Sequence, residues 1–122
     1  MSELSRNLLL AAAATAAALA ALIPATSASA QDFDCKTASL AAEKTICGHR
    51  RLSTLDERMA ELYGRLWAKL DDDNREGLRD YQRMFLETRN ACRHDATCIE
   101  GAYQDQIGVL KARLENHRFA HR

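Results

Sequence analysis

Apolar residues recur at spacings of three and four along most of the chain, a period that predicts amphipathic α-helices. Three long stripes of this kind predict helices over residues 53–70, 74–92 and 98–115. Their apolar faces should form the core, and its expected members are Leu55, Met59, Leu62, Tyr63, Leu66, Leu70, Leu78, Tyr81, Phe85, Leu86, Cys92, Ile99, Tyr103, Ile107, Leu110 and Leu114.

The expected helix ends follow from capping residues. A shorter helix is predicted over residues 39–47, because Ser39 can cap its start and Gly48 can end it. Each long helix has a candidate capping box, a polar residue followed three positions later by glutamate. These pairs are Thr54 with Glu57, Asp73 with Glu76, and Thr97 with Glu100.

Three helices of similar length with short connections pack most simply as a small antiparallel bundle. The fold class is therefore predicted to be all-α, with the short helix across one end of the bundle. The folded domain should span residues 31–115, and residues 116–122 should form a flexible C-terminal tail. A domain of about 90 residues buries only about 60–65% of its unfolded surface, so its core is thin.

The first thirty residues have a different pattern, which predicts a signal peptide over residues 1–30. A start with Glu3 and Arg6 precedes an uncharged run at 8–23 that is almost wholly leucine and alanine. A small-residue site at 28–30 follows, and cleavage after it would release the mature chain. The alternative is an uncleaved membrane anchor, but the run is shorter than the roughly 20 residues that cross a bilayer.

The expected location is the periplasm or the outside of the cell. Gln31 follows the cleavage site, where a lipid-anchored protein would have cysteine, so we expect no stable membrane anchor after cleavage. The chain has 17 lysines and arginines and 17 aspartates and glutamates. This balance gives no support for binding to nucleic acid or to anionic membranes.

All four cysteines, Cys35, Cys47, Cys92 and Cys98, follow the predicted cleavage site. An even number in a small exported domain predicts two disulfides. Zinc binding is the alternative. However, eleven residues lie between Cys35 and Cys47 and five between Cys92 and Cys98, whereas the paired ligands of structural zinc sites lie closer together in sequence. Three pairings are open, and we favour Cys35 with Cys47 and Cys92 with Cys98 because each pair flanks one short segment.

The sequence contains no motif of catalytic residues, so we expect no enzyme activity, no catalytic residue and no cofactor. The acidic run at 71–73 lacks the glycine of a calcium loop and is better explained as a helix cap. His117 and His121 could share a helix face as metal ligands, but they lie in the expected tail. We therefore predict no metal site.

Three residues are candidates for binding a protein partner. Arg50 and Arg51 belong to a basic cluster beside Cys47, where a disulfide would fix the loop that presents them; an ordinary solvated turn is the alternative. Trp67 lies next to an apolar stripe, so it forms either the rim of the core or an exposed anchor at an interface.

The four cysteines occur together with the segments Glu43-Lys44-Thr45-Ile46-Cys47 and Gln82-Arg83-Met84-Phe85-Leu86, and with Arg89 and Tyr103. This combination resembles the N-terminal domain of the LprI-like lysozyme inhibitors, a bacterial family, and the resemblance covers roughly residues 33–114. Phe85 stands where the family usually has tryptophan, and Gln106 stands where arginine is common.

The resemblance implies an exported envelope protein that acts by binding another protein, with lysozyme as the candidate target. It supplies no inhibitory residues. The alternative function is a structural or stress-related periplasmic module that docks on another envelope protein without inhibiting an enzyme. An exposed apolar patch would favour docking, and a projecting basic loop would favour inhibition.

Overall fold

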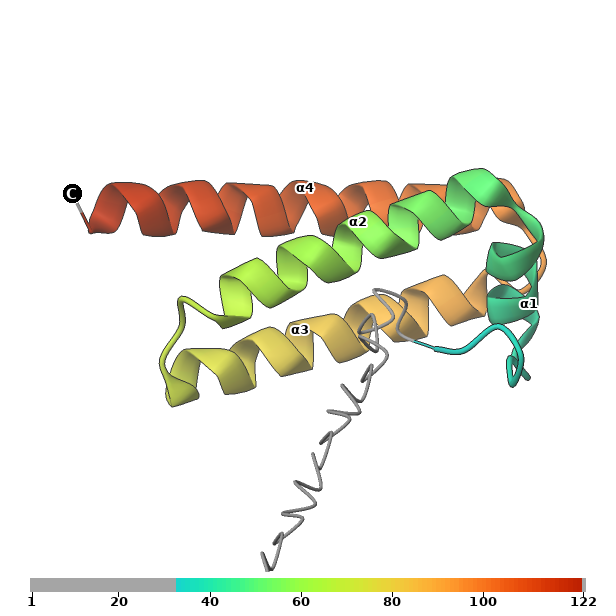
Figure 1. Ribbon diagram of the computed structural model, residues 1–122, viewed down its shortest axis with the longest axis horizontal. Coiled ribbons are helices and arrows are strands. Elements are labelled where there is room, and N and C mark those ends of the chain that lie inside the picture. Colours follow the sequence, from blue (N-terminus) through green and yellow to red (C-terminus); the bar gives the residue numbers. More distant parts are fainter. Residues whose placement is uncertain (1–32, 122) are drawn as a thin grey trace, which may run out of the picture.

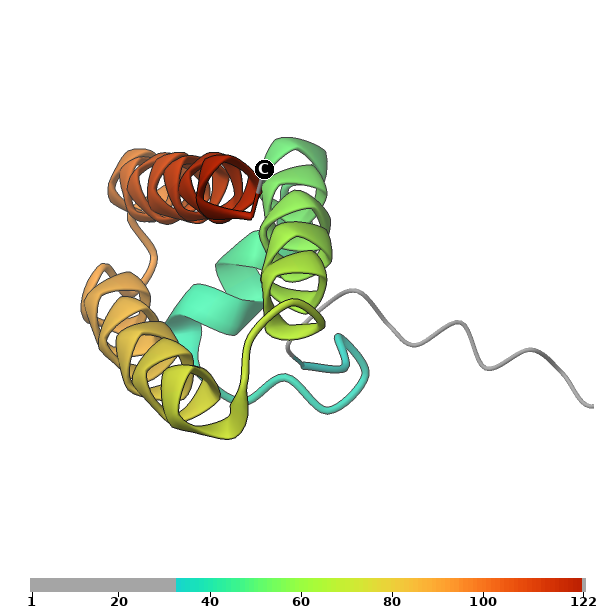
Figure 2. The same ribbon diagram turned by 90° about the vertical axis from the view of Figure 1, so that its left-hand side faces the viewer.

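The computed structural model describes residues 33–121, which form four α-helices and no strand. Three long helices lie along one another, and a short helix crosses one end of the bundle (Figure 1, Figure 2). The predicted all-α bundle of one short and three longer helices is confirmed. The predicted signal peptide, 1–30, lies outside the described residues. The helices are α1 (Ala41–Gly48), α2 (Arg50–Trp67), α3 (Asp72–Ala91) and α4 (Ala96–Ala120).

The helix that packs best against α2 is α4, which runs parallel to it (Figure 1). α3 runs antiparallel to both and packs against α4, whereas α2 and α3 have little direct contact although they are consecutive. α1 contacts all three long helices and closes one end of the core. The buried apolar residues are Ala42, Ile46, Leu52, Met59, Leu62, Leu66, Leu78, Phe85, Ile99, Ala102, Tyr103, Ile107 and Leu110.

Trp67 joins the two helices that pack least, α2 and α3. Its half-buried ring stacks on Tyr63 with ring centroids 6.0 Å apart. The guanidinium groups of Arg75 and Arg79 lie 5.3 and 5.1 Å from the ring centroid. Arg75 Nε also donates a hydrogen bond to the Trp67 carbonyl at 3.0 Å. These contacts give Trp67 a structural role in the connection between α2 and α3.

The predicted start of the second helix was wrong by three residues, because α2 begins at Arg50. Only His49, in an extended conformation, separates it from α1. The Thr54 hydroxyl does not cap the helix; it donates to the Arg50 carbonyl at 3.0 Å. The earlier start adds a helical turn that carries Leu52 into the core, where 2% of it is exposed.

The other two long helices also begin two residues before their predicted starts. The Asp71 carboxylate caps α3 by accepting from the Asn74 N–H at 3.0 Å, so Asp73 lies inside the helix. Asp95 caps α4 by accepting from the Cys98 N–H at 3.0 Å. Both aspartates precede the residues chosen from the sequence, because any polar residue near a helix start fits the capping pattern.

The fourth helix does not end at Glu115, and the expected tail is helical as far as Ala120. The half-buried Leu114 packs against the core. One turn later, the His117 ring hydrogen-bonds the Lys69 carbonyl at 3.0 Å, which ties this part of α4 to the end of α2. The tertiary contact thus extends a helix whose local sequence predicts fraying.

Candidate protein-binding surface

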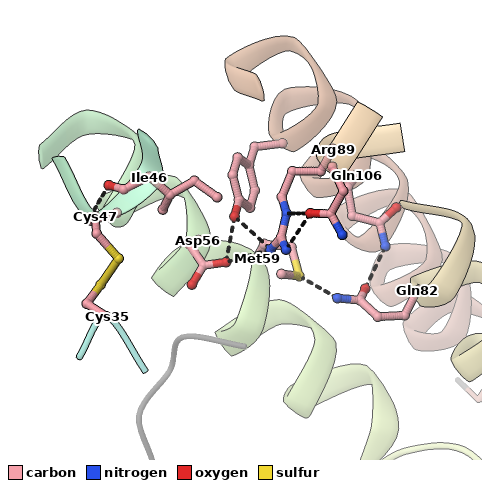
Figure 3. A network of polar contacts seen from close by, with 11 residues as sticks. Cys35, Ile46, Cys47, Asp56, Met59, Gln82, Arg89 and Gln106 are labelled. Carbon is pink, nitrogen blue, oxygen red and sulfur yellow. Dashed lines mark hydrogen bonds and ion pairs between the residues drawn. A yellow bond between two sulfur atoms is a disulfide. The ribbon is translucent and has the colours of Figure 1, made fainter. Parts of the chain in front are cut away.

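A buried polar cluster joins the three long helices beneath α1 (Figure 3). Asp56 comes from α2, Arg89 from α3 and Tyr103 from α4, and each is at most 2% exposed. The Tyr103 hydroxyl donates to Asp56 Oδ1 at 2.7 Å and accepts from Arg89 Nη1 at 3.3 Å. The same guanidinium nitrogen lies 4.0 Å from Asp56 Oδ1. One polar cluster therefore fixes the relative positions of three helices.

The other two nitrogens of the Arg89 guanidinium group also have a hydrogen-bond partner. Its Nε and Nη2 donate to Asn90 Oδ1 at 3.1 and 2.9 Å. The Phe33 ring lies over the guanidinium, 5.3 Å from its carbon atom, so the segment before α1 covers the cluster. A buried arginine needs such a set of partners, because an uncompensated charge in the core is strongly destabilising.

The environment of Tyr103 keeps its hydroxyl protonated. Burial raises the pKa of Tyr103 far above its ordinary value, and the negative charge of Asp56 raises it further. A protonated hydroxyl can donate to the Asp56 carboxylate, which is the arrangement observed. The cluster is thus suited to holding helices together and has no activated nucleophile at its centre.

A second buried pair crosses from α3 to α4. Gln106 Nε2 donates to Gln82 Oε1 at 2.9 Å, and Gln82 Nε2 lies 3.2 Å from the sulfur of Met59. Phe85 packs nearby on Tyr103 with ring centroids 5.3 Å apart. Phe85 and Gln106, the two residues that depart from the family pattern, therefore fit the core. Phe85 packs on Tyr103, and Gln106 is hydrogen-bonded to Gln82.

Both disulfides lie at the end of the bundle that α1 covers. The favoured pairing is confirmed, with Cys35 bonded to Cys47 and Cys92 bonded to Cys98. The first ties the segment before α1 to that helix, and the second closes the turn between α3 and α4. We call α1, residues 48–51 and residues 92–98 together the disulfide end.

Two further contacts join the parts of the disulfide end to one another. The Thr45 hydroxyl hydrogen-bonds His94 Nδ1 at 3.3 Å, which links α1 to the α3–α4 turn. Arg51 forms an ion pair with Glu100, with its Nε donating to Oε1 at 2.6 Å, which links α2 to α4. The hydrogen bond from Arg51 lowers the pKa of Glu100. The disulfide end is consequently cross-linked by covalent bonds and by side chains.

The exposed cations of the disulfide end include Lys44, Arg50 and Arg93. Arg93 adopts a left-handed conformation with φ of 54°, which costs an L-residue about 1–2 kcal/mol. The Cys92–Cys98 disulfide and a 3.0 Å hydrogen bond from the Asp95 N–H to the Cys92 carbonyl hold that turn. The scaffold thus fixes an exposed arginine in a conformation that it would seldom adopt in a free peptide.

The three residues selected from the sequence do not form one site. Arg50 is exposed in the first turn of α2, beside a shallow depression that Arg51, Thr54 and Leu55 also line. Arg51 is engaged with Glu100. Trp67 lies 17 residues further along α2, or about 25 Å at 1.5 Å per residue. Arg93 was not among the binding residues predicted from the sequence, although an arginine between two nearby cysteines is a usable signal.

The residues considered for metal binding have other contacts. Asp71 accepts from both the backbone N–H and the side-chain amide of Asn74. The rings of His117 and His121 lie 4.3 Å apart, and His117 is bonded to the Lys69 carbonyl. Over residues 33–121, the structure contains no group of three or more histidine, cysteine, aspartate or glutamate side chains arranged to hold a metal. In the same part of the chain, no helix is long and apolar enough to span a membrane.

The arrangement of helices and cysteines can be compared with known proteins. The family model described as "Lysozyme inhibitor LprI" matches residues 35–120. The chain belongs to the LprI lysozyme inhibitor family. The match begins at the first disulfide cysteine and ends with α4, so it covers every helix of this LprI-family domain. The comparison with curated proteins and the comparison with solved structures each found no match.

Proposed function

We propose that this protein is exported to the bacterial envelope, is not an enzyme, and inhibits lysozyme by binding it through the disulfide end. The observation that carries the proposal is the family match over all four helices. Membership in a family of inhibitors supports a protein partner, and two disulfides support a location outside the reducing cytoplasm.

The shape and rigidity of the disulfide end support its use as the binding surface. It is an end of the bundle rather than a hollow, so it can enter the cleft of another protein. Its cross-links lower the entropy lost on association, which is how preorganised inhibitors gain affinity. Its exposed cations, Lys44, Arg50 and Arg93, suit a cleft that contains acidic groups.

A cation in the cleft would oppose lysozyme chemistry in two ways. Lysozyme cleaves glycosidic bonds with two carboxyl groups, one of which must stay protonated to act as the acid. A guanidinium beside that group favours its ionised form and so removes the proton that the reaction needs. The inserted end would also exclude the polysaccharide from the cleft.

The alternative, a docking module without inhibitory activity, would be favoured by a continuous exposed apolar patch. Among residues 33–121, the large apolar side chains that are most exposed are Leu40, Met84 and Phe119, at 45%, 62% and 61%. They belong to the start of α1, the middle of α3 and the end of α4, so they are scattered over the surface. This distribution favours a charged binding surface over an apolar one.

The test measures the lysis of a bacterial-wall suspension by C-type and G-type lysozymes with the oxidised mature protein added at micromolar levels. We expect slower lysis by at least one type. Arg50→Glu should raise the half-inhibitory concentration at least about tenfold, because one like-charge contact costs more than 1.4 kcal/mol. Arg83→Glu is the matched control, since Arg83 is exposed on α3, away from the disulfide end, and pairs with Asp80 at 2.8 Å. Unchanged lysis with both enzymes would exclude inhibition.

A further inference from the structure

We propose that a second surface, a cationic groove between α2 and α4, binds an acidic segment of a protein. The groove has a volume of about 370 Å³ and lies along the half of these helices that is further from the disulfide end. Its lining, which defines the α2–α4 groove, is Arg58, Leu62, Arg65, Lys69, Lys111, Leu114, Glu115 and Arg118. The inference goes beyond lysozyme binding and does not depend on it.

The groove follows from the spacing of cations on two parallel helices. On α2, Arg58 and Arg65 are seven residues apart, which keeps them on one face, and Lys69 follows in the turn just beyond the end of the helix. On α4, Lys111 and Arg118 are again seven residues apart. The helices α2 and α4 lie side by side and run in the same direction (Figure 1). The two rows of cations therefore border one groove.

Most of the positive charge in the α2–α4 groove is not neutralised locally. Arg58 and Arg65 share Glu61, at 2.7 and 3.7 Å. Within the described part of the chain, no carboxylate lies within ion-pair distance of the other three cations, Lys69, Lys111 and Arg118. The whole chain has a formal net charge of zero, so this local excess is not a consequence of a basic composition. A concave surface with an excess of one sign of charge attracts ligands of the other sign.

The chemistry of the groove favours a peptide over a continuous polyanion. Leu114 is half-buried at its floor and offers an apolar contact, which a polyphosphate chain cannot use. Glu115 lines the groove, and Glu61 lies beside it, so an unbroken row of negative charges would meet two carboxylates. A polypeptide can avoid both by spacing its acidic side chains among apolar and neutral ones.

The length of the α2–α4 groove sets the size of the segment. Arg58 lies nine residues before Trp67, the end of α2, and Lys69 lies in the turn two residues beyond, so the row is about 16 Å long at about 1.5 Å per residue. That distance accommodates about five residues of an extended chain at 3.3 Å per residue, or three turns of a helix.

The experiment uses the full mature protein with its disulfides formed and a fluorescent peptide of about twelve residues built from Glu-Leu-Ala repeats, long enough to span the groove. Fluorescence anisotropy at low salt measures its affinity, and the same peptide with glutamine for glutamate controls for apolar binding. Lys111→Glu/Arg118→Glu should weaken binding at least about tenfold. The matched control is Lys36→Glu/Arg83→Glu, which makes the same change in charge at exposed positions outside the groove and the disulfide end and should leave affinity within about twofold.

A second variant, Lys111→Gln/Arg118→Gln, removes the charges without reversing them and should weaken binding by an intermediate factor, with an unchanged circular dichroism spectrum. Equal loss in the groove and control variants would overturn the proposal, as would equal affinity for the glutamate and glutamine peptides. Polyphosphate that binds in the groove more tightly than the peptide would overturn the choice of occupant. Lysozyme inhibition should persist in Lys111→Glu/Arg118→Glu, so a failure of the groove proposal can be distinguished from a failure of the lysozyme proposal.

Discussion

The Tyr103 hydroxyl of α4 donates a 2.7 Å hydrogen bond to the Asp56 carboxylate of α2, and both side chains are completely buried. This bond crosses the best-packed helix pair of the bundle. The same hydroxyl accepts a hydrogen bond from Arg89 of α3, so the Tyr103 side chain links all three long helices. The network lies below the disulfide end and supports the surface that we propose for lysozyme.

Removing the hydroxyl in Tyr103→Phe should destabilise the fold by about 1–3 kcal/mol, since the buried carboxylate and guanidinium lose a shared partner. Urea unfolding followed by circular dichroism measures the change. Tyr81→Phe serves as the control, because Tyr81 is half-buried and contacts Arg113 through its ring, 5.5 Å away. Equal effects of the two substitutions would contradict a structural role for the buried hydroxyl.

Arg89→Met should destabilise the protein by about 3–5 kcal/mol, because it leaves the Asp56 carboxylate buried without a compensating positive charge. The double substitution Asp56→Leu/Arg89→Met removes both charges and should recover part of that loss, as buried ion pairs often tolerate apolar replacement. Urea midpoints of the two variants measure the difference. A double variant that is less stable than Arg89→Met would show that this explanation is wrong.

The raised pKa of Tyr103 predicts a loss of stability in alkali. In the unfolded chain this tyrosine titrates near its ordinary pKa of about 10, whereas the folded state holds its proton to higher pH. Its contribution is therefore fully present below about pH 10 and declines above it, by up to about 1.4 kcal/mol per pH unit. Short urea titrations at increasing pH should show this decline in the parent protein and in Tyr81→Phe. Tyr103→Phe should show a shallower decline, and an equally steep one would contradict the assignment.

Each disulfide should contribute separately to stability. Serine at Cys35 and Cys47 opens a loop with a sequence separation of 12, and serine at Cys92 and Cys98 opens one with a separation of 6. Chain-entropy estimates predict losses of about 3 and about 2 kcal/mol. The urea midpoint of each double variant gives the measurement. The Cys92/Cys98 variant should also lose lysozyme inhibition beyond its loss of stability, because Arg93 is no longer held in its left-handed turn.

Much of the fold could be predicted because local rules act on local sequence. The stripe through Met59, Leu62 and Leu66 predicts a buried helix face whatever its neighbours are, and all three residues are buried. The favoured cysteine pairing is confirmed, because each disulfide closes one short segment, although the sequence left two other pairings open. The helix starts were less accurate, since Asp71 and Asp73 fit the same capping preference and only the packed structure distinguishes them.

The candidate surface was predicted only in part. Arg50 and Arg51 were selected as a pair, but Arg51 is engaged with Glu100, which is 49 residues away in sequence. Arg93 was missed because its conformation depends on the turn that the second disulfide closes. The cations of the α2–α4 groove, such as Arg65 and Lys111, look like ordinary solvated residues until two helices bring them to one groove.

The sequence by itself determined the helical class and the approximate extent of the helices, and it favoured, among three open pairings, the cysteine pairing that the structure contains. The hydrophobic periodicity, the order of the elements along the chain and the short loop lengths can all be read directly from the local sequence. Only the tertiary structure decided that α2 packs mainly on α4, that Asp56 and Arg89 are buried with Tyr103, and that α4 extends to Ala120. These features depend on contacts between residues far apart in sequence, where a polar side chain is stable in the core only if its partners arrive from other helices.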